Sequence, residues 1–201
     1  MSVSPGEPRL SAGKKKPGDL KLAYLKITCP VPNVYLGGLM ITDGRGLPAE
    51  FRYTEPIQPT RIQQVLYGQV LSSYIKREVI LETLLKSVSA KFQALIVEDE
   101  ELLEALHKNV PVFRLSETQT APLEARGEMQ ELGEGEILLQ TSAKGNPVHL
   151  WWHLADQSGN TAPYSVLIEA GETMDVEEPL KRITKALEII CQEAGITSRG
   201  S

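Results

Sequence analysis

The chain has 201 residues, 41% of them hydrophobic, and a formal net charge of −5. This share of hydrophobic residues supplies a real core for one large or two small domains. The acidic balance argues against broad attraction to nucleic acid or to anionic membranes. No apolar run approaches the roughly 20 residues that cross a bilayer. Two distant cysteines and no secretory leader argue against a disulfide framework or a zinc ribbon, and the cytoplasm is the expected compartment.

Both ends of the chain have the composition of tails. Residues 1–19 contain almost nothing apolar to bury, which predicts a disordered segment. The triplet Lys14, Lys15 and Lys16 is a solvated basic run, with weak contact to nucleic-acid phosphates as its functional alternative. Residues 197–201 form a second tail, and Gly200-Ser201 has the sequence of a cloning remnant.

Residues 20–115 predict an α/β domain that begins with three strands. Apolar and polar residues alternate from Leu22 to Cys29, as in a strand with one buried face. The next two strands form a hairpin over Val34–Tyr53, turning at Asp43-Gly44. Within this hairpin, Gly37-Gly38 mark either a bulge or a close approach of the backbone to a neighbour.

A long helix is predicted after this hairpin. Thr60 and Gln63 form a capping box, and apolar residues recur at helical spacing to about Val88, with Leu66 in the core. The length of the helix predicts a break near Gly68 or Lys76. A buried strand over Phe92–Val97, a short helix from Glu98 to about His107 and a strand over Val110–Leu115 complete the domain.

The second half predicts a smaller unit. Residues 116–134 are acidic without a stable apolar period and form a connection. Residues 135–196 predict a small α+β domain of three strands and one helix. The strands are expected at Glu136–Thr141, Val148–Ala155 and Pro163–Glu169, and the helix runs from Asp175 to Gly195. The predicted fold class is therefore mixed α/β, with a five-stranded mixed sheet and a three-stranded α+β half.

The order of elements over Leu22–Leu115 resembles the ribonuclease H-like fold. Enzymes of that class hold two divalent metals, Mg²⁺ or Mn²⁺, on carboxylates of the first strand, the first helix and the end of the fourth strand. The resemblance implies a metal-dependent nuclease that uses Glu98 and Asp99 with Glu78 or Glu82. The first strand, however, contains no carboxylate, and losing this central ligand disables two-metal hydrolysis. A degenerate version without catalytic residues, metal or cofactor is therefore preferred.

The acidic residues also have structural explanations. Carboxylates from Glu98 to Glu101 suit the first turn of a helix, where each adds about 0.3 to 1 kcal/mol. Asp43 precedes a glycine in a hairpin, where aspartate is a common turn residue. Nucleophile and phosphate-binding motifs are absent from the sequence.

One strand offers an interaction surface. In Val148–Ala155, alternation puts Trp152 on the apolar face and Trp151 on the other face with His149 and His153. Tyr164 is expected as a neighbour of Trp151, which makes this face a candidate protein interface. The alternative is burial of this face beneath another layer.

The preferred function is a noncatalytic interaction or assembly subunit of a cytoplasmic complex. Its partner is a protein of unknown identity, with nucleic acid expected only at the basic tail and no membrane contact. The alternative is the metal-dependent nuclease, and a third hypothesis is a small-ligand sensing module with a pocket between the halves. The positions of the carboxylates discriminate between the first two, because a nuclease needs them to converge.

Overall fold

One eight-stranded mixed sheet runs through the part of the chain that the computed structural model describes, residues 19–103, 110–152 and 163–196. The strand order is β3-β2-β1-β4-β5-β8-β7-β6. Strands β1, β4 and β5 are parallel to one another, and all other neighbouring strands are antiparallel. The strands are β1 (Lys21–Val31), β2 (Val34–Asp43), β3 (Pro48–Tyr53), β4 (Ala94–Val97), β5 (Val112–Ser116), β6 (Met129–Gly133), β7 (Glu136–Leu139) and β8 (Val148–Trp152).

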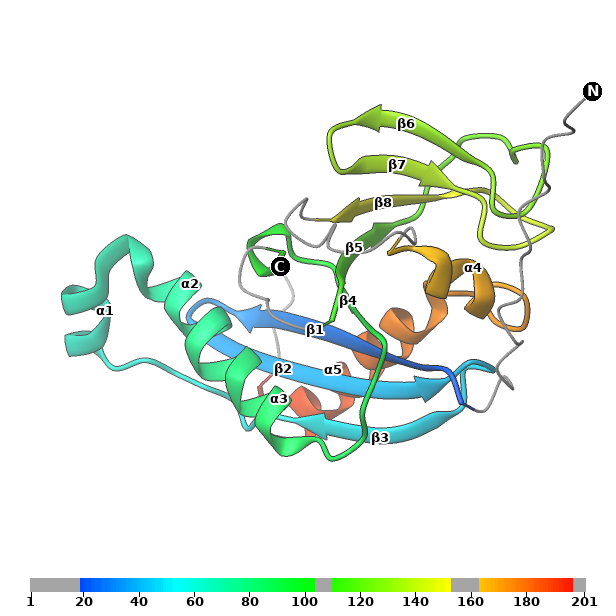
Figure 1. Ribbon diagram of the computed structural model, residues 1–201. Helices are drawn as coiled ribbons and strands as arrows, with labels where there is room; N and C mark the ends of the chain where they lie inside the picture. Colours follow the sequence, from blue (N-terminus) through cyan, green and yellow to red (C-terminus); the bar gives the residue numbers. More distant parts are fainter. Residues whose placement is uncertain (1–18, 104–109, 153–162, 197–201) are drawn as a thin grey trace, which may run out of the picture.

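Helices cover both faces of this sheet (Figure 1). One layer is a series of helices between β3 and β4, broken at Gly68, and the other contains α4 and α5. A short helix, η3 (Glu100–Leu102), follows β4. The first layer consists of α1 (Arg61–Tyr67), η1 (Gly68–Val70), α2 (Leu71–Tyr74), the π-helix η2 (Ile75–Leu81) and α3 (Glu82–Ser87). The second consists of α4 (Ser165–Ala170) and α5 (Glu178–Glu193).

Strand β1 is buried on both faces rather than on the one that its alternation predicts. Leu22 and Tyr24 belong to the core beneath α5, whereas Ala23 and Leu25 belong to the core beneath η2 and α3. All four side chains are fully buried. The alternation is real, but a helix layer covers each side, so the polar hydroxyl of Tyr24 is buried as well.

The two glycines of β2 mark close approaches of the helix layers. A Cβ on Gly37 would lie 2.2 Å from Cγ2 of Ile80, in η2. A Cβ on Gly38 would lie 3.0 Å from Cγ2 of Ile183, in α5. Successive residues of a strand face opposite ways, so this glycine pair admits one helix on each face. The predicted close approach is confirmed.

The long helix begins and breaks as predicted. Thr60 Oγ1 accepts a hydrogen bond from the Gln63 backbone N–H, and the Gln63 side chain accepts one from the Thr60 N–H, which confirms the capping box. Gly68 ends α1 with a φ of +52°, and Lys76 lies in the π-helix. Leu66 was placed wrongly, because its side chain is 76% exposed and α1 buries none of its residues.

The second half extends the sheet instead of forming a separate three-stranded one. Strand β6 lies in the segment predicted as a connection, and the predicted strand Pro163–Glu169 is mostly the helix α4. Strands β7 and β8 are confirmed, and β8 pairs directly with β5. The fold is thus mixed α/β, with eight strands in place of five. The domain boundaries at 116–134 stay a prediction, and the expected tails at 1–18 and 197–201 lie outside the described residues.

We predict that Gly37→Ala destabilises the protein by about 1 to 3 kcal/mol, because the added methyl group overpacks the contact with buried Ile80. Urea denaturation measures the effect. Gly133→Ala is the matched control, since a Cβ there meets nothing nearer than 3.4 Å and should change stability by less than about 0.5 kcal/mol. Equal losses of unfolding free energy in the two variants would show that the close contact between Gly37 and Ile80 does not limit packing.

Candidate functional site

The carboxyl edge of the parallel strands brings a lysine to a carboxylate. Leu25 of β1 pairs with Val97 of β4, so the residues that follow, Lys26 and Glu98, come side by side. Their side chains form an ion pair, with Lys26 21% exposed and Glu98 50% exposed. Burial lowers the pKa of the Lys26 ammonium, and the charge of Asp99 opposes this shift.

A second lysine reaches the same edge from the π-helix. Lys76 Nζ lies 2.7 Å from Asp99 Oδ2 and 3.3 Å from Glu101 Oε2. Asp99 also caps η3, because its Oδ1 accepts a hydrogen bond from the Glu101 N–H. The two carboxylates that end β4 therefore each have an ammonium group as partner.

Lys26 also lines a cleft of about 330 Å³ between β1 and α5. The residues Leu180, Ile183, Leu187 and Cys191 turn the apolar face of α5 toward the sheet. The adjacent stripe of the helix lines the cleft with polar groups. The lining consists of Lys26, Thr28 and Pro30 from β1 with Thr184, Glu188, Cys191, Gln192 and Ile196.

The predicted aromatic face lies on the other side of the sheet from the Lys26 cleft. Arg114 pairs with Trp151 across β5 and β8, and its Cζ lies 4.4 Å from the centroid of the Trp151 ring. The Arg114 Nε–H also donates to the carbonyl oxygen of Glu98 at 3.1 Å. His149 stacks on Trp151 with ring centroids 3.6 Å apart, and its Nε2 lies 2.6 Å from Glu136 Oε1.

The strand register of this face is as predicted. Val148 and Leu150 are buried in the core, and Trp152 packs against it. Tyr164 contacts Trp152, with ring centroids 5.8 Å apart, rather than Trp151. It lies on the other face because it precedes a helix instead of sitting on a neighbouring strand. His153 lies outside the described residues, as do Lys14, Lys15 and Lys16.

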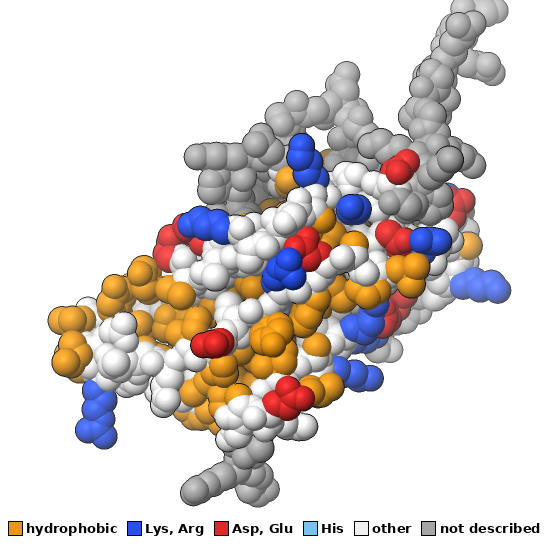
Figure 2. Space-filling model, turned by 90° about the horizontal axis from the view of Figure 1, so that it is seen from below, with side chains coloured by type: hydrophobic (Ala, Val, Ile, Leu, Met, Phe, Trp, Pro, Cys, Tyr) orange, Lys and Arg blue, Asp and Glu red, His pale blue; other side chains and the backbone are white. Residues whose placement is uncertain are grey.

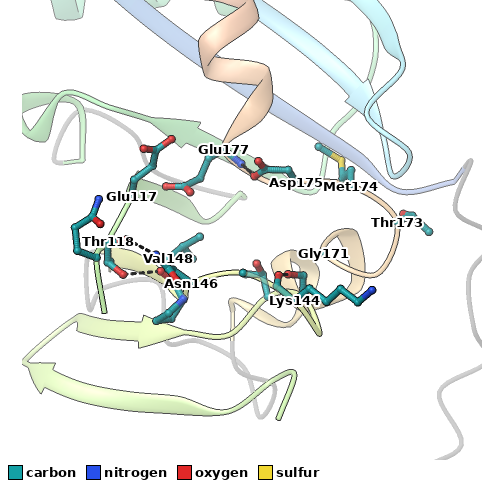
Figure 3. A pocket seen from close by; sticks show the side chains of 15 residues that line it. Glu117, Thr118, Lys144, Asn146, Val148, Gly171, Thr173, Met174, Asp175 and Glu177 are labelled. Atoms are coloured by element: carbon teal, nitrogen blue, oxygen red, sulfur yellow. Dashed lines mark hydrogen bonds between the residues drawn. The ribbon is translucent and has the colours of Figure 1, made fainter. Parts of the chain in front are cut away.

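A second cavity, of about 510 Å³, lies at the other end of α5 (Figure 3). Glu117, Asp175 and Glu177 line its acidic end, and Lys144 comes from the loop on its opposite side. Partial burial, with the charges of Asp175 and Glu117, raises the pKa of Glu177 to about 7. The acidic end disfavours a phosphate ligand here.

The other predicted carboxylates do not converge on Glu98. Glu82 pairs with Lys86 at 2.5 Å on the exposed side of α3, and Glu78 is exposed on η2. Asp43 accepts hydrogen bonds from the N–H groups of Arg45 and Leu47, so its explanation as a turn residue holds. These hydrogen bonds help to lower the pKa of Asp43 despite some burial.

The donor set does not fit the two-metal centre that the ribonuclease H-like resemblance implies. Within 19–103, 110–152 and 163–196, no three His, Cys, Asp or Glu side chains gather in a group that could hold a metal ion. Lys26 stands on β1, where such a centre needs a carboxylate, and its ammonium pairs with Glu98. Lys26 and Arg114 were missed as site residues, because each stands at an ordinary polar position of its strand.

Known structures share this arrangement of strands and helices. The chain aligns with endonuclease V from Bacillus subtilis at 11% identity and a TM-score of 0.55, over 87% of this chain and 82% of that one. Endonuclease V from Streptomyces avermitilis aligns at 11% identity and a TM-score of 0.55, over 90% and 85%. The fold is similar to that of endonuclease V. No family model and no curated protein matches the sequence.

A third structure, Ciona intestinalis endonuclease V in complex with a 23mer DNA containing an inosine, aligns at 7% identity and a TM-score of 0.48, over 86% of each chain. The endonuclease V-like fold corrects two expectations. The assembly subunit of a protein complex is wrong as the preferred function, because the structural neighbours are nucleases. The expectation of a protein partner, with nucleic acid bound only at the basic tail, is also wrong, because the structural neighbours are endonucleases. No helix in the described residues is long and apolar enough to cross a membrane.

We predict that the stability of the protein falls as the pH rises from about 4.5 to about 7, through the raised pKa of Glu177. A carboxyl group with a raised pKa binds its proton more tightly in the folded state, so its contribution is complete below the unfolded value and is lost above the folded one. Glu177→Gln should remove this contribution to the pH dependence. It should raise stability at pH 8 by about 1 kcal/mol, after allowance for solvent screening.

Thermal melts across this pH range measure both effects. Glu172→Gln is the control, because Glu172 is an exposed carboxylate near the same cavity whose ion pair with Arg126 is solvent-exposed. A pH profile that is unchanged in Glu177→Gln would show that another group titrates in this window.

Proposed function

We propose that this protein binds nucleic acid along the carboxyl edge of its sheet, in the cleft beside Lys26 and across the face that carries Arg114 and Trp151. The observation that carries the proposal is that the fold is similar to that of endonuclease V over nearly the whole chain. The charged side chains described above lie at the carboxyl edge of this fold. Its neighbours are named as endonucleases, and the chain presents a lysine cleft on one face of this edge and an arginine-tryptophan pair on the other face.

The cleft has the chemistry of a phosphate contact. Lys26 supplies an ammonium group, and Thr28 and Gln192 supply a hydroxyl and an amide donor beside it. The cavity at the other end of α5 carries three carboxylates and would repel a phosphate. The Lys26 cleft is therefore the better site, even though the whole chain is acidic.

The opposite face of the same edge favours an unpaired base. Trp151 presents an indole already flanked by the guanidinium of Arg114 and the ring of His149. Aromatic rings and arginine planes stack on bases that are single-stranded or turned out of a helix, at about 1 to 3 kcal/mol per base. We therefore expect single-stranded nucleic acid to bind more tightly than a duplex.

Hydrolysis of nucleic acid is a second candidate function, because the neighbours with this fold are endonucleases. Glu98 and Asp99 are the carboxylates that such an activity would use. They are bound to Lys26 and Lys76, and the described residues do not complete a metal site. Cleavage assays of the wild type with Mg²⁺ or Mn²⁺ decide this candidate. Cleavage that is lost in Glu98→Gln would establish it.

We predict that Lys26→Ala weakens the binding of a labelled single-stranded oligonucleotide by roughly tenfold or more, the worth of one charge-assisted hydrogen bond. Fluorescence anisotropy over a series of salt concentrations measures it, and the variant should also show a shallower salt dependence. Lys86→Ala is the control, because this exposed lysine forms an ion pair with Glu82 on α3. Equal affinities for wild type and Lys26→Ala would contradict the proposed site.

We also predict that Lys26→Asp creates a site for Mn²⁺ that the described residues of the wild type do not form. The substitution removes the ammonium group from Glu98 and places a third carboxylate at the edge beside Glu98 and Asp99. Isothermal titration with MnCl₂ measures binding directly. Lys26→Asn carries no new charge and is the matched control. Equal Mn²⁺ binding by the wild type and Lys26→Asp would show that Lys26 does not block a metal.

A further inference from the structure

The first helix of the long helical run exposes an apolar surface that the chain does not bury. Figure 2 shows hydrophobic side chains gathered at the end of the molecule that α1 and α2 form. The most exposed are Val65 at 81%, Leu66 at 76% and Ile62 at 70%. We call this surface the α1 patch; it consists of Ile62, Val65, Leu66, Tyr67, Val70 and Tyr74.

Such a helix is poorly supported within its own chain. The seven residues of α1 are fewer than the roughly 12 to 15 that an isolated helix needs in water, and none of them is buried. Its supports are the capping box at Thr60 and the contact of Tyr67 with Tyr74, whose ring centroids are 4.8 Å apart. Ile62, Val65 and Leu66 have the i, i+3, i+4 spacing of a helix face that packs against another element.

The low charge of the segment indicates which kind of partner the α1 patch binds. From 61 to 74 the only charged residue is Arg61. Nucleic acid binds through several Lys or Arg contacts to phosphates, and helices that lie on membranes carry a basic polar face. The α1 patch has neither property, so its occupant is another apolar protein surface with little charge.

We propose that the α1 patch is the interface of a homodimer, in which two copies pack α1 against α1 about a two-fold axis. A second copy supplies an apolar surface of the same size, and a two-fold axis sets each patch against its own equivalent. Repulsion between the copies is small because each segment carries a single charge.

The size of the surface fits a small stable interface. Weighted by their exposed fractions, the six side chains present on the order of 600 Å² of apolar area, the upper end for an ordinary monomer. Two copies would bury about 1,200 Å² in total, which is the lower limit of stable specific interfaces. The Lys26 cleft lies on the α5 side of the sheet, in the other helix layer, so the dimer leaves it open. The proposal does not rest on the proposed nucleic-acid binding.

Size-exclusion chromatography with light scattering, on the full chain over a series of concentrations, tests the dimer. We expect a mass near twice the 22.1 kDa of the chain. Val65→Glu should give a monomer with an unchanged circular dichroism spectrum, because the side chain is exposed in the single chain. Ile189→Glu is the matched control, since Ile189 is 54% exposed on α5, and this variant should remain a dimer.

Leu66→Ser provides a second, milder test if Val65→Glu does not fold, and it too should be monomeric. A wild type that stays monomeric at its highest soluble concentration overturns the proposal, whether or not it binds lipid vesicles in the same buffer. A dimer that persists in folded Val65→Glu or Leu66→Ser overturns it as well, because the interface would then lie elsewhere.

Discussion

The architecture depends on how closely two helix layers approach one strand. At Gly37 and Gly38, β2 offers no side chain to either face, and a branched isoleucine fills the space on each side. The neighbouring strand β1 is buried on both faces in consequence, and its residues divide between two separate cores. The depth at which α5 sits over the sheet also sets the width of the cleft between that helix and Lys26.

Electrostatics at the carboxyl edge follow from the strand pairing. Because β1 and β4 are adjacent parallel strands, Lys26 and Glu98 lie side by side. Lys76 of η2 lies close to Asp99. A divalent cation and a lysine ammonium both neutralise carboxylates, but an ammonium group cannot polarise a phosphodiester as a metal does. Ammonium groups therefore neutralise the carboxylates at this edge, in a fold similar to that of endonuclease V.

Local signals in the sequence predict the local structure well. The Thr60 cap, the hairpin and the alternation of β1 each depend on neighbouring residues. The predicted strand Pro163–Glu169 failed because a short apolar run has no period that separates a strand from a helix. The site was predicted only in part: Trp151 and Glu98 have recognisable surroundings, whereas the role of Lys26 depends on a parallel pairing across some 70 residues, which no local pattern encodes.

The π-helix between α2 and α3 has a geometric consequence. In an α-helix each residue rotates the side-chain direction by about 100° about the helix axis. A π-helical turn contains one residue more than an α-helical turn, because its hydrogen bonds join residues i and i+5. Deleting one residue from Ile75–Leu81 would restore the regular ladder and rotate α2 about the helix axis, carrying α1 with it beyond the break at Gly68. The number of residues in this segment, as much as their chemistry, thus aims the apolar face of α1 away from the body of the protein.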